Sequence, residues 1–198
     1  MKFWLIAMAF GSSFPLFAAN STPLTQLKFA DEALQECVFD AANSANIHRV
    51  EEISFVQCDV NGPISLKGLA QLPALQTLVI SDANVKDLDA LANSPKLTSL
   101  MLTRTHFEQL KPLQKPNLDV IFSDANMADW RQLGELRLGS LAIQHPQDCH
   151  QLRPLAHDKR IALITQNSST NDIATGMLTS PNANKTVVML DCPLNALQ

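Results

Sequence analysis

The sequence predicts an α/β solenoid, a stack of short coils that each join one strand to one return segment. Apolar residues recur every 22 residues between Pro63 and Leu133. Within each copy their spacing changes from two to three, and Pro95 and Pro116 stand near the ends of two copies. Periods of roughly 20 to 50 residues indicate repeats that are too small to bury their apolar faces alone, so neighbouring copies must stack.

The repeat is regular in two copies and shortened in a third. Residues spaced by 22 are Leu66 with Leu88 and Leu110, Leu69 with Leu91 and Leu113, Leu78 with Leu100, Ile80 with Leu102, and Val85 with Phe107. A copy two residues shorter carries Val120, Phe122, Met127, Trp130 and Leu133. Trp130 stands in the place of a leucine, so we expect it to fill the core.

The first 19 residues have the order of a secretory signal: Lys2, an apolar run from Phe3 to Phe10, and small residues at Ala18 and Ala19. The apolar run is shorter than the ~20 residues that cross a bilayer, and no later segment supplies such a run. We therefore expect cleavage of residues 1–19 and a mature chain without a membrane span.

Each copy begins as a strand and ends as a helical return. Leu78 and Ile80 are two residues apart, which is the period of a strand, whereas Val85, Leu88 and Leu91 follow at spacings of three. Such a spacing indicates a short helical or 3₁₀ return. Proline at the end of a return prevents a longer helix.

The pattern Leu-x-x-Leu-x-Leu, followed by an apolar residue and Leu-x-x-Leu, resembles the leucine-rich repeat family in its bacterial, internalin-like form with repeats of about 22 residues. The copies that begin at Leu75 and Leu97 carry it in full. The resemblance implies a short curved stack of about seven coils with parallel strands on the concave face. Phe29–Val38 resembles the amphipathic helix that caps the first coil of that family. The family often places asparagine where this chain has Ala83, Thr105 and Ala125, so the loops must satisfy their buried backbone groups otherwise.

Weaker strands flank the regular repeats. We predict an earlier strand with Ile53 and Phe55, and later strands with Leu141 and Ile143, Ile161 and Leu163, and a closing strand with Val187 and Met189. Residues 20–198 then form one domain: a cap at 20–48, a first coil at 49–62, regular repeats at 63–133, and irregular repeats with a C-terminal cap at 134–198. Gln166 to Lys185 is rich in Ser, Thr and Asn, which indicates a long loop with one helical turn near Asp172 to Leu178.

The cysteines suggest a crosslink at each end of the stack. Aligning the strand at Ile53 with the strand at Val187 puts Cys58 and Cys192 at the same place in the first and last coils. We expect Cys37 to pair with Cys58 and Cys149 with Cys192, although the sequence allows three connectivities. Buried free thiols are the alternative. Export favours oxidised cysteines.

Composition excludes several classes of partner. Removal of Lys2 from a chain with 15 basic and 19 acidic residues leaves a net charge of about −5, which disfavours nucleic acid. About 180 residues are enough for one core. His145, His150 and His157 lie near Cys149, but they lack the paired short spacings of a zinc site, so we expect no metal and no cofactor. No Gly-x-Ser-x-Gly occurs, so we also expect no catalytic residues and no enzyme activity.

The middle outward position of successive strands is apolar. We predict a binding strip on the concave face at Val79, Met101, Ile121 and Ala142, with Ala162 and Val188 as further members. The bordering residues are Thr77, Ser99 and Asp119 on one side, and Ser81, Thr103 and Ser123 with Asp82, Arg104 and Asp124 on the other. An apolar centre with a polar border is typical of protein interfaces. The alternative is that β-branched residues simply suit strands.

These observations favour an exported, periplasmic or secreted, non-catalytic protein that binds a protein or peptide on its concave face. The alternative is a structural or glycan-binding protein of the cell envelope. Sugars usually stack on exposed aromatic rings, yet the chain has no Tyr, and Trp130 is the only Trp after the signal.

Overall fold

The computed structural model describes residues 22–107, 113–165, 176–177, 186–192 and 194–197. Residues 1–21, which include the predicted secretory signal, and Leu110 lie outside the described residues. Of the predicted helical turn at 172–178, only Gly176–Met177 is described, and it forms the two-residue strand β9, which pairs antiparallel with β8 (Ile161–Thr165).

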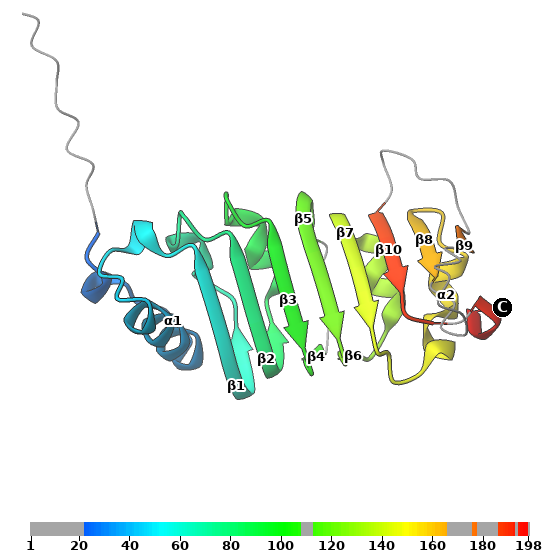
Figure 1. Ribbon diagram of the computed structural model, residues 1–198, viewed down its shortest axis with the longest axis horizontal. Coiled ribbons are helices and arrows are strands. Elements are labelled where there is room, and N and C mark those ends of the chain that lie inside the picture. The colour runs from blue at the N-terminus through cyan, green and yellow to red at the C-terminus, as the bar shows by residue number, and fades with distance from the viewer. Residues whose placement is uncertain (1–21, 108–112, 166–175, 178–185, 193, 198) are drawn as a thin grey trace, which may run out of the picture.

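One sheet of parallel strands runs the length of the molecule, with the return segments behind it (Figure 1). Its main strands are β1 (Phe55–Ser65), β2 (Thr77–Lys86), β3 (Ser99–Thr103), β5 (Gln114–Ser123), β7 (Arg137–Gln144), β8 and β10 (Thr186–Leu190). The 3₁₀ returns at Leu69–Gln71, Leu88–Asn93, Trp130–Glu135 and Cys149–Leu152, and the short helix α2 (Arg153–Ala156), connect them. The predicted leucine-rich repeat solenoid is confirmed.

The stack is held by matching apolar residues of successive coils. Leu78 lies beside Leu100, and Leu100 lies beside Val120, while Phe122 lies beside Leu102 in the next inward row. All of these side chains are at most 1% exposed. Trp130 is also buried, as predicted, and the rings of Phe107 and Phe122 lie 5.3 Å apart inside the coils. Burial between coils, which no single coil can achieve, is therefore the main source of stability.

The N-terminal cap is the helix α1 (Glu32–Ser44), which buries Leu34, Val38 and Ala42 against the first coil. The predicted limits of this helix, Phe29 and Val38, are wrong at both ends. The helix begins at Glu32 because the Asp31 carboxylate accepts the Leu34 N–H at 2.9 Å and so caps the first turn. The same carboxylate accepts the Ser65 N–H at 2.9 Å, which ties the cap to β1.

The first strand has a different register from the predicted one. Val56 and Cys58 point inward opposite Leu78 and Ile80, whereas Phe55 points outward and is 50% exposed. The sequence contains two competing alternations here, one starting at Ile53 and one at Val56. Stacking on the next coil selects the alternation that starts at Val56, because Val56 lies 22 residues before the inward Leu78. Ile53 lies 22 residues before Leu75 and so belongs to the segment that precedes the strand.

The closing strand is not at the end of the sheet. Strand β10 lies between β7 and β8 and is parallel to both, as the red strand in Figure 1 shows. Val188 and Leu190 point inward and are buried, so the predicted inward residues Val187 and Met189 are wrong by one position. Cys192 lies two residues beyond the inward Leu190, whereas Cys58 is itself an inward strand residue, so the predicted equivalence of Cys58 and Cys192 is also wrong.

The expected cysteine pairs are nevertheless present. Cys37 is bonded to Cys58 across a Cα–Cα distance of 5.3 Å, and Cys149 to Cys192 across 5.9 Å. The first bond ties α1 to β1, and the second ties the return after β7 to the end of β10. Each constrains the chain where a coil lacks a regular neighbour, which in the chain-entropy description stabilises the fold by ~3–4 kcal/mol.

Thr186 fastens β10 to the preceding coil. Its buried hydroxyl donates to the Leu136 carbonyl at 3.1 Å and accepts the Leu138 N–H at 3.2 Å. These two backbone groups lie beside the irregularity in the pairing of β5 with β7. One side chain of the inserted strand therefore gives a partner to a backbone donor and a backbone acceptor of the preceding coil.

We predict that Leu100→Ala lowers the free energy of unfolding by ~2–5 kcal/mol, because it leaves a cavity between two coils. Urea denaturation followed by circular dichroism measures the change. Met101→Ala in the same strand is the control, because Met101 is 37% exposed, and a loss of less than ~1 kcal/mol is expected there. Equal effects of the two substitutions would contradict the inward register.

We also predict that Thr186→Val, which keeps the shape of the side chain, destabilises the protein by ~1–3 kcal/mol, since it leaves the Leu136 carbonyl and the Leu138 N–H unpaired. Thr103→Val is the matched control, because the half-exposed Thr103 hydroxyl makes no hydrogen bond to a described residue. The same denaturation measurement applies. A neutral Thr186→Val would show that these backbone groups find other partners.

Candidate functional site

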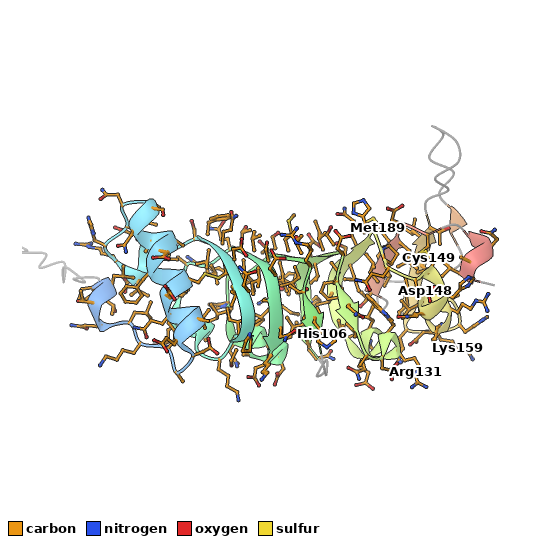
Figure 2. All side chains as sticks on the ribbon, turned by 90° about the horizontal axis from the view of Figure 1, so that it is seen from below. His106, Arg131, Asp148, Cys149, Lys159 and Met189 are labelled. Atoms are coloured by element: carbon orange, nitrogen blue, oxygen red, sulfur yellow. A yellow bond between two sulfur atoms is a disulfide. The ribbon has the colours of Figure 1, made fainter. Side chains whose placement is uncertain are left out.

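The outward side chains of the parallel strands form one continuous face, which we call the open face. In its middle row the strand register places, from one end of the sheet to the other, Gln57, Val79, Met101, Ile121, Ala142, Met189 and Ile164. Figure 2 shows Met189 on the opposite side of the molecule from Arg131 and Lys159, which belong to the return side. The middle row is therefore apolar from Val79 onward.

In the part of the chain that the structure describes, the large exposed apolar side chains lie on the open face. Among the described residues three large apolar side chains are exposed: Phe55 at 50%, Met101 at 37% and Met189 at 37%. Met101 and Met189 are in the middle row, and Phe55 is in the row next to it. Scattered exposed apolar residues are ordinary, but their concentration on one face indicates a contact surface.

Polar side chains border the middle row on both sides. The upper row contains Phe55, Thr77, Ser99, Asp119, Ser140 and Val187. Here the Ser140 hydroxyl donates to Asp119 Oδ1 at 2.7 Å and orients that carboxylate on the face. The lower row contains Asp59, Ser81, Thr103, Ser123 and Gln144. Both borders therefore carry side chains with hydrogen-bonding groups.

Below the lower row each coil turns sharply through one left-handed residue. These corner residues are Asn61, Asp82, Arg104, Asp124 and His145, with φ between 47° and 54°. Asparagine and aspartate tolerate this conformation better than other non-glycine residues. The corner N–H groups bond to the next coil: Arg104 N–H donates to the Ser123 carbonyl at 2.8 Å, and Asp124 N–H to the Gln144 carbonyl at 3.1 Å. Backbone hydrogen bonds between coils thus satisfy polar groups of these loops, which lack the asparagines that the family often has there.

Asp82 and Arg104 form an ion pair across two neighbouring corners. Arg104 Nε donates to Asp82 Oδ1 at 2.7 Å, and Arg104 Nη2 donates to Asp82 Oδ2. The hydrogen bonds from Arg104 hold the pKa of Asp82 below its ordinary value, and the pKa of Arg104 is raised in turn. Asp59 and Asp124 also attract the Arg104 cation.

A hollow opens at the other end of the corner row, where β10 lies beside β7. It has a volume of about 290 Å³ and is lined by Ala142, Ile143, Gln144, His145, Met189, Leu190 and Asp191. His145 Nδ1 lies 3.8 Å from Asp124 Oδ2, and His145 Nε2 lies 3.9 Å from Asp191 Oδ2. Both distances exceed a hydrogen bond, so the imidazole stands between the two carboxylates without binding either tightly.

The predicted site residues all lie on one side of the molecule. Thr77, Val79, Ser99, Met101 and Ile121 are outward residues of adjacent strands, and Asp82, Arg104 and Asp124 are successive corner residues. Two further members of the predicted strip are wrong. Val188 is buried, and the register pairs Ala162 with Val187, so Met189 and Ile164 occupy the middle row instead.

Sequence reasoning missed residues at both ends of the open face. Phe55, Gln57 and Asp59 could have been found by extending the 22-residue period one copy towards the N-terminus. Met189, Asp191 and His145 come together only because β10 is inserted beside β7, and no periodic signal in the sequence indicates that insertion. The hollow was therefore absent from the predicted site.

The described residues do not bring together the ligands of a metal site. Cys149 is bonded to Cys192, so its sulfur is not available as a ligand. Within residues 22–107, 113–165 and the shorter described segments, no group of three or more His, Cys, Asp or Glu residues is arranged to hold a metal ion. No helix in the same part of the chain is long and apolar enough to span a membrane.

Comparison with known proteins gives matches among solved structures. No family model and no curated protein matches the chain. The structure is similar to that of internalin C2 from Listeria monocytogenes, with 19% identity over 87% of this chain and 98% of that chain and a TM-score of 0.36. It is also similar to internalin F from the same organism, with 16% identity over 70% of this chain and 58% of that chain and a TM-score of 0.33.

We predict that Arg104→Gln raises the pKa of Asp82 towards its ordinary value, because the charged hydrogen bonds that favour the carboxylate are lost. In the unaltered protein the lowered pKa means that this pair stabilises the fold above the unfolded-state pKa of Asp82, and that the stabilisation is lost as pH falls through the folded-state pKa. Carboxyl NMR titration measures both proteins. Asp129, whose pKa is lowered by Arg131, is the internal control and should not change.

Proposed function

We propose that this leucine-rich repeat protein is an exported, non-catalytic binding protein that holds a protein or peptide segment on its open face. The observation that carries the proposal is the concentration of the exposed large apolar side chains on that face, beside polar rows. Interfaces are commonly built in this way, with an apolar centre that excludes water and a polar border that sets orientation.

The rigidity of the solenoid supports this function. The middle row is carried by strands whose inward neighbours are almost completely buried, so the outward side chains are held at fixed spacings. A preorganised surface loses little conformational freedom when a ligand binds, and more of the contact energy remains as affinity. Ligand recognition then requires no movement of the backbone.

Export is supported by two independent features. The first 19 residues have the order of a secretory signal. The four cysteines form two disulfides, and such bonds persist in oxidising compartments such as the periplasm or the extracellular space. For glycan binding, the alternative function, Trp130 offers no stacking platform because it is buried at 6% exposure.

The test compares partner capture by the unaltered protein and by the Met101→Asp/Ile121→Asp pair. Purified envelope and host extracts are passed over each immobilised protein, and captured proteins are identified and then re-bound in purified form. We expect the pair to fold normally and to lose at least ~90% of the binding, because two carboxylates in the apolar row must be desolvated.

Ala92→Asp/Gln151→Asp is the matched control, since it adds the same charge at exposed positions of the return segments. Binding of the purified partner should be unchanged in this control. Retained binding by the Met101→Asp/Ile121→Asp pair would exclude the open face as the contact surface.

A further inference from the structure

The open face carries mainly negative charge. The carboxylates of its three outward rows and the corner row are Asp59, Asp82, Asp119 and Asp124, and Asp191 lies at the hollow; the only arginine among these described positions is Arg104. Those described positions contain no lysine. Arg104 is already paired with Asp82. Above the upper row Arg137 is directed to the carbonyls of Gly134 and Leu136, at 3.2 and 3.0 Å. The face is therefore apolar along its middle from Val79 onward, and the charged residues around this row are mainly acidic.

The hollow beside β10 brings apolar and acidic side chains together. Ala142 and Met189 supply an apolar wall, and Met189 is 37% exposed there. Asp191 lies at the same hollow with its side chain 39% exposed, and it makes no side-chain hydrogen bond to a described residue. Asp124, on the far side of His145, accepts a single bond from Ser123 Oγ at 3.3 Å. Asp191 thus keeps acceptor capacity next to an apolar wall, and Asp124 adds negative charge beyond His145.

We propose that the segment held on the open face is apolar and basic, and that one of its lysine or arginine side chains enters the hollow at the ends of β7 and β10. This inference rests on the proposed function and names the chemistry of the partner. The aliphatic stem of the cationic side chain lies against Met189 and Ala142, as such stems do on apolar surfaces. Its charged end meets Asp191, which lines the hollow, and hydrogen bonds between opposite charges are stronger than neutral ones. Asp124, on the far side of His145, adds to the negative potential at the hollow.

Charge complementarity favours a basic, apolar segment over two other possible occupants of the open face, a second copy of this chain and an acidic ligand. A second copy of this chain would place its own row of carboxylates against the first, and like charges across an interface weaken association. An acidic protein or a sulfated or phosphorylated glycan meets the same repulsion. A basic segment with apolar side chains gains from the middle row and from the borders together.

The test uses the mature, disulfide-bonded protein and three fluorescent ten-residue peptides in which every second residue is leucine or valine. The remaining positions are lysine in the first peptide, glutamine in the second and glutamate in the third. Fluorescence anisotropy at moderate salt measures Kd. We expect the lysine peptide to bind at least about tenfold more tightly than the glutamine peptide, and the glutamate peptide to bind most weakly. The difference should shrink as salt rises.

Substitutions test whether the hollow is the anchor, that is, the place where the cationic side chain of the peptide binds. Asp124→Asn/Asp191→Asn should weaken binding of the lysine peptide by about tenfold and leave the glutamine peptide unchanged, since only charge-assisted bonds are lost. Glu36→Gln/Asp40→Asn on α1 is the control with the same change in net charge, and it should leave the lysine peptide bound as before. His145→Lys should weaken the lysine peptide as well, because a fixed cation then occupies the hollow, whereas His145→Gln should not.

The outcomes separate this proposal from the proposed function. Equal binding of the lysine and glutamine peptides, with loss of both in Met101→Asp/Ile121→Asp, overturns the basic partner but leaves the open face as the binding surface. A lysine peptide whose binding survives Asp124→Asn/Asp191→Asn overturns the anchor in the hollow. Binding that survives Met101→Asp/Ile121→Asp overturns both, and failure of the lysine peptide to bind overturns the basic partner.

Discussion

The structure depends on apolar contacts between successive coils. A single coil of this chain has too few residues to enclose its own leucines, so Leu78 is shielded from water only when Leu100 lies beside it, and Leu100 only when Val120 follows. This requirement aligns the strands in parallel and in register. It also places the intervening residues of every strand on one open face, so the same contacts that stabilise the fold fix the geometry of the candidate binding surface.

The apolar core must be covered separately at each end of such a stack, because a terminal coil has a neighbouring coil on one side only. At the first coil, α1 covers the core, Asp31 joins the helix to β1, and the Cys37–Cys58 bond crosslinks the two. Towards the other end the chain returns and inserts β10 between β7 and β8. Thr186 and the Cys149–Cys192 bond hold this strand in place. The insertion gives β10 a neighbour on both sides, so its inward residues are as well buried as those of the regular coils.

The outward residues of the strands connect the fold with the candidate binding surface. Inward positions must be apolar, but outward positions are free to vary, and here they are apolar in the middle row and polar or acidic at the borders. The left-handed corners extend the lower border by one residue from each coil. A surface of this kind can recognise an extended chain through side-chain chemistry alone, since the strands already supply the correct spacing.

Much of the fold and part of the candidate site could be predicted from the sequence. The 22-residue period determined the solenoid, the inward leucines and the outward row from Val79 to Ala142, because stacking forces equivalent residues into equivalent environments. Extended by one copy, the same period also determines the inward position of Cys58. Only the tertiary structure decided the place of β10 and the meeting of His145, Met189 and Asp191. Strand order in a sheet depends on which edges are left unpaired after the rest of the chain has folded, and a local sequence pattern contains no record of those edges.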